Sequence, residues 1–177
     1  MRTLLVGLDN HRKAPPHRAL WPIPEKETGA VLMRLIDEHV DEEYRPGAFV
    51  LDFARTNLYP MRRAPNGRGM TAQDSDAIAH LIYTAGMIGV NDIVLIGSRV
   101  VRAFNQAMGE NLTWLESCVI ETNTDELRRF WAVPYPDKRF VQFRKHRDDM
   151  GKLLAMLRNR TMIPYGKHIL KKHEQNA

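Results

Sequence analysis

Short apolar runs alternate with amphipathic segments along most of the chain, and turn residues separate them. Runs rich in Val, Ile and Leu predict strands that are buried on both faces of a parallel sheet. These predicted strands cover residues 3–8, 48–58, 92–98, 114–121 and 129–136. Apolar residues at helical spacing predict helices over residues 25–40, 72–89, 99–108 and 148–160, with Thr71 as the N-cap of the second. The order predicts an α/β protein, a three-layer α/β/α sandwich around a central, mainly parallel sheet of four to five strands.

Length and composition indicate one globular unit. The chain has 177 residues, of which 44% are hydrophobic and 27% charged, so we expect a single domain over residues 1–165 and a basic tail over residues 166–177. No run has the apolar length of a membrane span and no signal-type segment opens the chain, so we expect a cytoplasmic protein. The single cysteine, Cys118, excludes an internal disulfide and a four-cysteine metal site, and we expect neither metal nor cofactor.

The chain carries a formal net charge of +5, which favours a polyanionic partner such as nucleic acid. Its cations gather at residues 11–18, 62–68, 138–147 and 167–172. The first three groups fall in predicted loops or near helix starts, where several could line one face. The last is expected to be a solvated end of the chain. Together with the small size, this surface predicts a monomer without a membrane partner.

Small and polar residues follow the carboxyl ends of four predicted strands. In open parallel sheets these ends face one crevice, where ligands bind and helix N-termini point. The four segments are Gly7–His11, Thr56–Tyr59, Gly97–Arg99 and Pro134–Arg139. We expect them to meet.

Four motifs in the same order resemble the uracil-DNA glycosylase superfamily along most of the chain. They are "GLDNHR" with its continuation "KAPPHRAL" at residues 7–20, "ARTNLYPMRRAPNGRG" at 54–69, "IVLIGSRVVRAF" at 93–104 and "AVPYPDKR" at 132–139. In that family the first motif activates water, the second reads the base, and the last corresponds to an H-P-S sequence. The resemblance implies a uracil-DNA glycosylase-like fold and a nucleotide flipped out of DNA as the substrate.

The chemistry of such a site requires a carboxylate near the sugar. Breaking an N-glycosidic bond places positive charge on the sugar and negative charge on the departing base. A carboxylate can stabilise the first charge and orient or deprotonate water. The resemblance gives this catalytic position to Asp9, with Asn10 beside it. The alternative is a turn-forming Asp9 whose side chain bonds nearby backbone N–H groups.

Five side chains are candidates for contact with the flipped base: Asn57, His11, Trp21, Tyr135 and Asp137. The amide of Asn57 has an acceptor and donors in one plane, which suits a pyrimidine edge; otherwise Asn57 caps or bends the strand end. His11 or Trp21 could stack on the base, or Trp21 belongs to the core. His11 replaces the family's Tyr beside the pyrimidine 5-position, which predicts room for a substituent there. Tyr135 replaces the His of H-P-S, so its hydroxyl would be the donor to the base.

Two further differences from the family bear on the substrate. Asn10 stands where the family has Pro, and Asp137 replaces the Ser of H-P-S. Asp137 would bring a second carboxylate to the site, where it could bind a sugar hydroxyl or an amino group but would repel an anionic leaving base. These changes disfavour ordinary uracil as the substrate.

Basic, polar and aromatic residues beside the motifs predict contacts with DNA. The set comprises Arg12, Lys13, Arg62, Arg63, Arg68, Ser98, Lys138, Arg139 and Phe140. In the family, the loop that holds the last three fills the gap left by the flipped nucleotide, and a cation next to an aromatic suits that task. The alternative is that these loops are solvated and bind nothing.

The sequence therefore predicts a monofunctional DNA glycosylase that removes a damaged or modified base, a 5-substituted pyrimidine, in DNA repair or in defence against phages with modified DNA. No lysine is placed as a Schiff-base nucleophile, so water would attack. Two alternatives remain open. One is a non-catalytic nucleic-acid-binding module on the same fold, and the other is a hydrolase of free nucleosides or nucleotides.

Overall fold

The computed structural model describes residues 3–9, 15–23, 27–60, 64, 72–122 and 126–158. Five strands form one sheet in the order β2-β1-β3-β5-β4. Their bounds are Thr3–Asp9 (β1), Phe53–Tyr59 (β2), Asp92–Ile96 (β3), Ser117–Glu121 (β4) and Leu127–Val133 (β5). Neighbouring strands run parallel except for β4, which pairs antiparallel with β5 at one edge.

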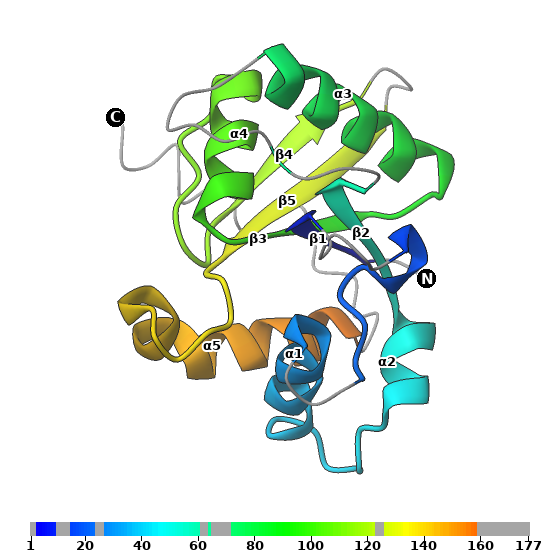
Figure 1. The fold of residues 1–177 in the computed structure, drawn as a ribbon, viewed down its shortest axis with the longest axis vertical. Coiled ribbons are helices and arrows are strands. Elements are labelled where there is room, and N and C mark those ends of the chain that lie inside the picture. The colour runs from blue at the N-terminus through cyan, green and yellow to red at the C-terminus, as the bar shows by residue number, and fades with distance from the viewer. Residues whose placement is uncertain are drawn as a thin grey trace.

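Helices cover both faces of this sheet (Figure 1). One face packs against α3 and α4, and the other against α1, α2 and α5. The helix bounds are Thr28–Asp37 (α1), Pro46–Asp52 (α2), Ala72–Met87 (α3), Ser98–Met108 (α4) and Val141–Arg158 (α5), and a 3-10 turn, η1, spans Pro16–Arg18. The predicted three-layer α/β/α sandwich is therefore confirmed.

The central strands each contain a run of apolar residues because both of their faces are buried. On β1, Leu4 and Val6 belong to the core beneath α3 and α4, whereas Leu5 belongs to the core beneath α1, α2 and α5. In the first core, the rings of Phe104 and Phe130 stack at 4.6 Å between centroids. Each apolar run thus holds two helix layers to one sheet.

One predicted strand, over residues 48–58, is wrong in its first five residues. Residues 46–52 form α2, and β2 begins only at Phe53. Pro46 stands in the first turn of α2, where its fixed φ suits a helix. Within α2, Phe49 is buried and Leu51 is 72% exposed. The run "AFVL" therefore buries only one side, as a surface helix does, and not both sides, as a central strand would.

Other boundaries differ less. The last helix begins at Val141, seven residues before the predicted start, and α1 is shorter than its predicted range. Cys118 is buried, as expected. Among the described residues, no helix has the length and apolarity needed to cross a bilayer. Thr71 and the tail at residues 166–177 lie outside the described residues.

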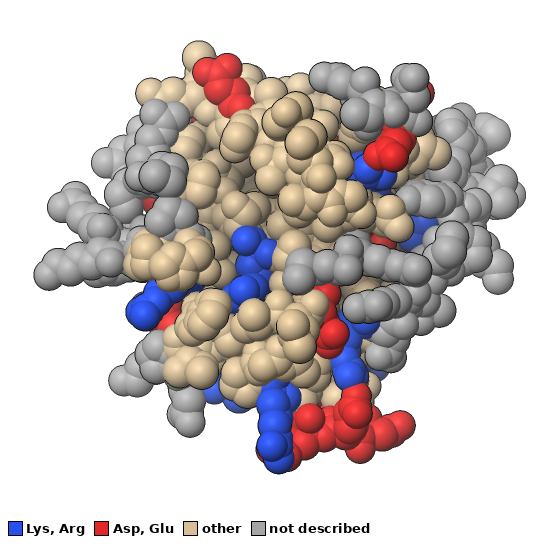
Figure 2. Space-filling view, turned by 90° about the vertical axis from the view of Figure 1, so that its right-hand side faces the viewer, with Lys and Arg blue, Asp and Glu red and all other residues tan. Residues whose placement is uncertain are grey.

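Charge is unevenly spread over the surface. Figure 2 shows a face on which the area over α3 is largely uncharged, while Lys and Arg side chains gather in a central band. Acidic side chains occupy its lower end, and the connection from α1 to α2 contributes the exposed Asp41, Glu42 and Glu43. The net positive charge is therefore not uniform.

Candidate functional site

A cavity of about 670 Å³ opens at the carboxyl ends of the parallel strands. Its lining includes residues from all four strand-end segments, among them Asp9, Asn57, Ser98 and Tyr135. The starts of α1, α4 and α5 supply further walls. The strand ends meet as expected, and the volume lies in the range of small-molecule sites, about 300–1,000 Å³.

Asp9 ends β1 and lines this cavity. One carboxylate oxygen, Oδ2, accepts a hydrogen bond of 2.8 Å from the backbone N–H of Ala64. Ala64 lies 55 residues away in the sequence, in the segment after β2. The carboxylate is therefore held by the fold rather than by its own turn alone, at the edge of the space where a ligand would lie.

Asn57 is 5% exposed and lies beside Gly7, its register partner across β1 and β2. A Cβ atom added to Gly7 would come closer than 3.0 Å to Asn57 Oδ1 and to 3.2 Å from Leu20 Cδ2. Gly7 therefore creates the space that the Asn57 amide occupies. The glycine of the "GLDN" motif and the asparagine of the second motif form one packed pair in the cavity floor.

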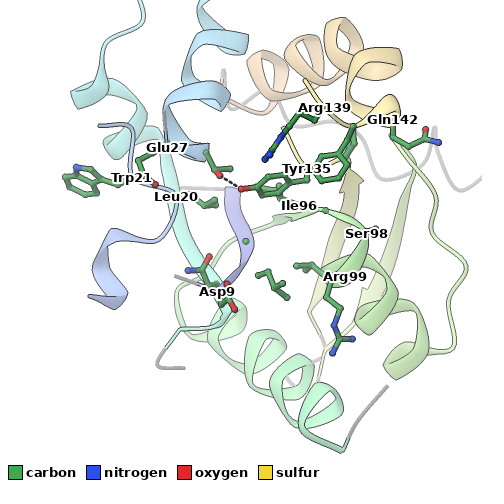
Figure 3. A pocket seen from close by; sticks show the side chains of 18 of the residues that line it. Asp9, Leu20, Trp21, Glu27, Ile96, Ser98, Arg99, Tyr135, Arg139 and Gln142 are labelled. Carbon is green, nitrogen blue, oxygen red and sulfur yellow. Dashed lines mark hydrogen bonds between the residues drawn. The ribbon is translucent and has the colours of Figure 1, made fainter. Parts of the chain in front are cut away.

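Trp21 lines the cavity, but its indole points away from Asp9 (Figure 3). The guanidinium of Arg55 lies over that ring, 4.9 Å from its centroid, in a cation–π arrangement. Burial lowers the pKa of Arg55. The preceding residue, Leu20, has a positive φ of 49°, and Gly29 packs against the backbone of Leu20 and Trp21 so closely that a Cβ would overlap it. Trp21 thus packs on Arg55 in a tightly held wall.

Tyr135 spans the cavity towards α1. Its hydroxyl and the Thr28 hydroxyl are 2.9 Å apart, and either can donate the hydrogen bond, drawn as a dashed line in Figure 3. The ring also contacts Phe140 edge to face, at 6.1 Å between centroids and an interplanar angle of 83°. Behind it, Gly97 has a φ of 93° and leaves room for Tyr135 Cβ. Tyr135 remains 44% exposed and can meet a ligand.

Asp137 pairs with Arg139 and is not part of the cavity lining, whereas Arg139 is. The Arg139 side chain donates to both carboxylate oxygens, and its backbone N–H donates to Oδ1 at 2.9 Å. These hydrogen bonds lower the pKa of Asp137 and raise that of Arg139. Arg139 thus already neutralises the Asp137 carboxylate, which does not line the cavity where a base would bind. Contact between Asp137 and a base stays a prediction.

The rest of this loop is exposed. Lys138 and Phe140 face solvent, and Phe140 is 52% exposed. The Arg144 guanidinium on α5 donates to the backbone carbonyls of Lys138 and Arg139 at 2.8 and 3.2 Å. The loop therefore projects from the cavity rim and is braced from below.

A second ion pair stands at the start of α4. Arg99 lines the cavity, and its Nη2 donates to both oxygens of Asp74 at 2.9 and 3.0 Å. Asp74 is fully buried on α3 and also accepts a short hydrogen bond from the Tyr59 hydroxyl. Ser98 is exposed beside this pair. The positive charge of Arg99 is therefore compensated before any ligand enters.

Several predicted site residues lie outside the described part of the chain. They are Asn10, His11, Arg12, Lys13, Arg62, Arg63 and Arg68. Their roles stay predictions.

The structure adds cavity residues that the motifs did not indicate. They include Glu27, Thr28, Trp114 and Gln142, and the lining also holds Arg18, which belongs to the first motif but was not predicted as a site residue. Glu27 and Thr28 start α1, and Gln142 is in the first turn of α5. The first residues of α1 and α5 could have been suspected as cavity residues because both helices follow loops at strand ends. Which of their side chains face the cavity depends on packing, which the amino-acid sequence alone does not give. Among the described residues, no group of His, Cys, Asp and Glu could hold a metal ion.

The fold and the cavity define a class, α/β sandwich proteins with a ligand-sized pocket at the carboxyl edge of a mainly parallel sheet. No protein-family model matches the chain, and no curated protein is significantly similar to it.

Proposed function

We propose that the protein is a monofunctional DNA glycosylase that hydrolyses the N-glycosidic bond of a modified base, a 5-substituted pyrimidine. The observation that carries the proposal is one cavity lined by a carboxylate, Asp9, and a buried amide, Asn57, at the ends of adjacent strands. A carboxylate beside the sugar and a planar amide beside the base are the two groups that this reaction needs. We also propose that it acts as a monomer on a nucleotide flipped out of DNA.

In this mechanism Asp9 orients a water molecule towards C1′ of the sugar. The water oxygen forms a bond to C1′, the bond from C1′ to the base nitrogen breaks, and its electron pair leaves with the base. Asp9 takes the proton from the water and stabilises the positive charge on the sugar in the transition state. Asn57 and the Tyr135 hydroxyl offer hydrogen bonds to the base as it gains negative charge.

A second candidate is a hydrolase of free nucleosides. Arg99 and Arg139 are both paired with aspartates, so the described wall offers less unpaired positive charge than contact with several phosphates requires. A nucleoside carries no phosphate and fits a cavity of this volume.

One assay separates these candidates. Duplex and single-stranded oligonucleotides carrying uracil or a 5-substituted pyrimidine, including glycosylated ones, are incubated with the protein and then treated with alkali to reveal abasic sites; the matching nucleosides are tested in parallel. We expect strand cleavage that falls at least about 100-fold in Asp9→Asn. The matched control is Asp76→Asn, which changes an exposed aspartate on α3 outside the cavity.

Two results would contradict the glycosylase proposal. Tight binding to DNA without base release across the whole panel would indicate a non-catalytic binding module. Base release from nucleosides but not from DNA would indicate the nucleoside hydrolase. Whether an active enzyme serves repair or defence against phages with modified DNA follows from which base in the panel it removes.

A further inference from the structure

The cavity has two ends of different chemistry (Figure 3). Asp9 and Arg99 lie at the end formed by β1 and α4. Glu27, Tyr135 and Arg139 lie at the other end, where α1 begins and the loop before α5 passes. The proposed reaction uses Asp9 at the first end and takes only the Tyr135 hydroxyl from the second, so the part of the second end around Glu27 can receive another part of the substrate.

The volume supports such a division. A pyrimidine base and a deoxyribose have eight non-hydrogen atoms each, and even at the roughly 30 Å³ that a whole water molecule occupies in the liquid, the two together take less than about 480 Å³. The cavity measures about 670 Å³. A substituent of several further atoms therefore fits.

The charge of the lining is less positive than its residue types suggest. Arg18, Arg99 and Arg139 stand against Asp9 and Glu27. However, Arg99 and Arg139 each hold an aspartate that is not itself in the lining. At the second end, Arg139 is thus compensated, whereas Glu27 is paired with no cation among the described residues. This difference favours a cationic group at that end over a second anion.

Glu27 is the carboxylate at the second end. It occupies the N-cap position of α1, yet its side chain makes no capping hydrogen bond. Within the described part of the chain it forms no ion pair or hydrogen bond through its carboxylate, and it lines the cavity. The next residue, Thr28, has its hydroxyl 2.9 Å from the Tyr135 hydroxyl, at the same end of the cavity.

We propose that the second end of the cavity binds a positively charged amino group on the substituent of the base, with Glu27 as its counter-ion. The inference rests on the proposed function and names its substrate class, a pyrimidine whose 5-substituent ends in a primary amine. The amine donates to the carboxylate of Glu27, and the Thr28 hydroxyl can accept another of its hydrogen bonds, while the Tyr135 hydroxyl serves the base.

The test compares three oligonucleotides that are identical except for 5-aminomethyluracil, 5-hydroxymethyluracil or thymine at one position. Single-turnover base release is measured for the wild type, Glu27→Gln and the control Glu121→Gln, which changes an exposed glutamate on β4 outside the cavity. The Kd for each oligonucleotide is measured by fluorescence anisotropy in the Asp9→Asn background, with and without Glu27→Gln, so that no substrate is consumed.

We expect the wild type to favour the aminomethyl base over the hydroxymethyl base about tenfold, as one charge-assisted contact near solvent allows. Glu27→Gln should remove this preference and change the hydroxymethyl base less than twofold, and Glu121→Gln should keep the preference.

The two proposals can fail separately. Base release without a Glu27-dependent amine preference would overturn this inference and leave the glycosylase intact. A Glu27-dependent amine preference in Kd, with no base released from any oligonucleotide, would support the binding site and overturn the glycosylase.

Discussion

Replacing Gly7 by alanine is the sharpest single test of how the cavity floor is built. The new Cβ would stand closer than 3.0 Å to the Oδ1 atom of buried Asn57 and 3.2 Å from Leu20 Cδ2. Gly7 is not among the described residues with positive φ, so alanine fits its backbone conformation. The expected loss of stability is therefore steric. It comes mainly from the clash with the Asn57 amide, because the Leu20 methyl group can move more easily.

The magnitude follows from two opposing effects. Overpacking a buried site costs typically about 1–3 kcal/mol, while alanine recovers about 0.4–1 kcal/mol by restricting the unfolded chain. Because the contact is with a buried amide, we expect the upper part of that range and a net loss of about 2 kcal/mol. That loss corresponds to an increase of about thirtyfold in the unfolding equilibrium constant.

Urea denaturation of a double-mutant cycle measures this value. Gly7→Ala is compared in the wild type and in the Asn57→Ala background, where its cost should fall below about 1 kcal/mol because the amide is gone. Gly86→Ala is the control, since a Cβ there meets nothing within 4 Å; it should be neutral or stabilise by up to about 1 kcal/mol. Equal costs of Gly7→Ala in both backgrounds would refute the reasoning.

Three further changes test other parts of the structure. Asp74→Ala should cost about 3 kcal/mol in urea denaturation, because it leaves the largely buried Arg99 without its counter-ion; a loss below about 1 kcal/mol would contradict this role of the pair. Burial raises the pKa of Tyr44 above its ordinary 10.0, so the protonated hydroxyl stabilises the fold fully below pH 10, and this contribution is lost as the pH rises further. The wild type should then lose up to about 1.4 kcal/mol per pH unit more than Tyr44→Phe above pH 10, and parallel curves would disprove this. Asp137→Asn should free Arg139 and steepen the salt dependence of DNA binding by up to about one unit of slope; an unchanged slope would show that Arg139 does not meet phosphate.

The fold was predictable because its signals are local. Apolar runs such as residues 3–8 predict strands buried on both faces, and the helical segments between them imply parallel pairing. The error at residues 48–52 has the same origin. Four apolar residues in a row indicate a buried segment but not its period, and here Phe49 alone of that helix is buried.

The site was predictable only at the strand ends. A parallel sheet brings the carboxyl ends of its strands together, so the amino-acid sequence is enough to group Asp9, Asn57 and Tyr135. The partners of those residues depend on packing between distant segments. The Thr28 hydroxyl reaches Tyr135 across 107 positions, and the pairing of Asp137 with Arg139 depends on how the loop turns, which no spacing rule gives.

The arrangement of the three tryptophans has a practical consequence. Trp21 and Trp114 line the cavity, whereas Trp131 is 3% exposed and donates its indole N–H to Asp92 at 3.0 Å. Asp92 begins β3, at the end of that strand opposite the cavity. Two indoles therefore report on whatever enters, and the third supplies a steady background signal. Intrinsic fluorescence can therefore follow occupancy of the cavity without an attached label. The variants Trp21→Phe and Trp114→Phe would show which of the two indoles senses the bound ligand.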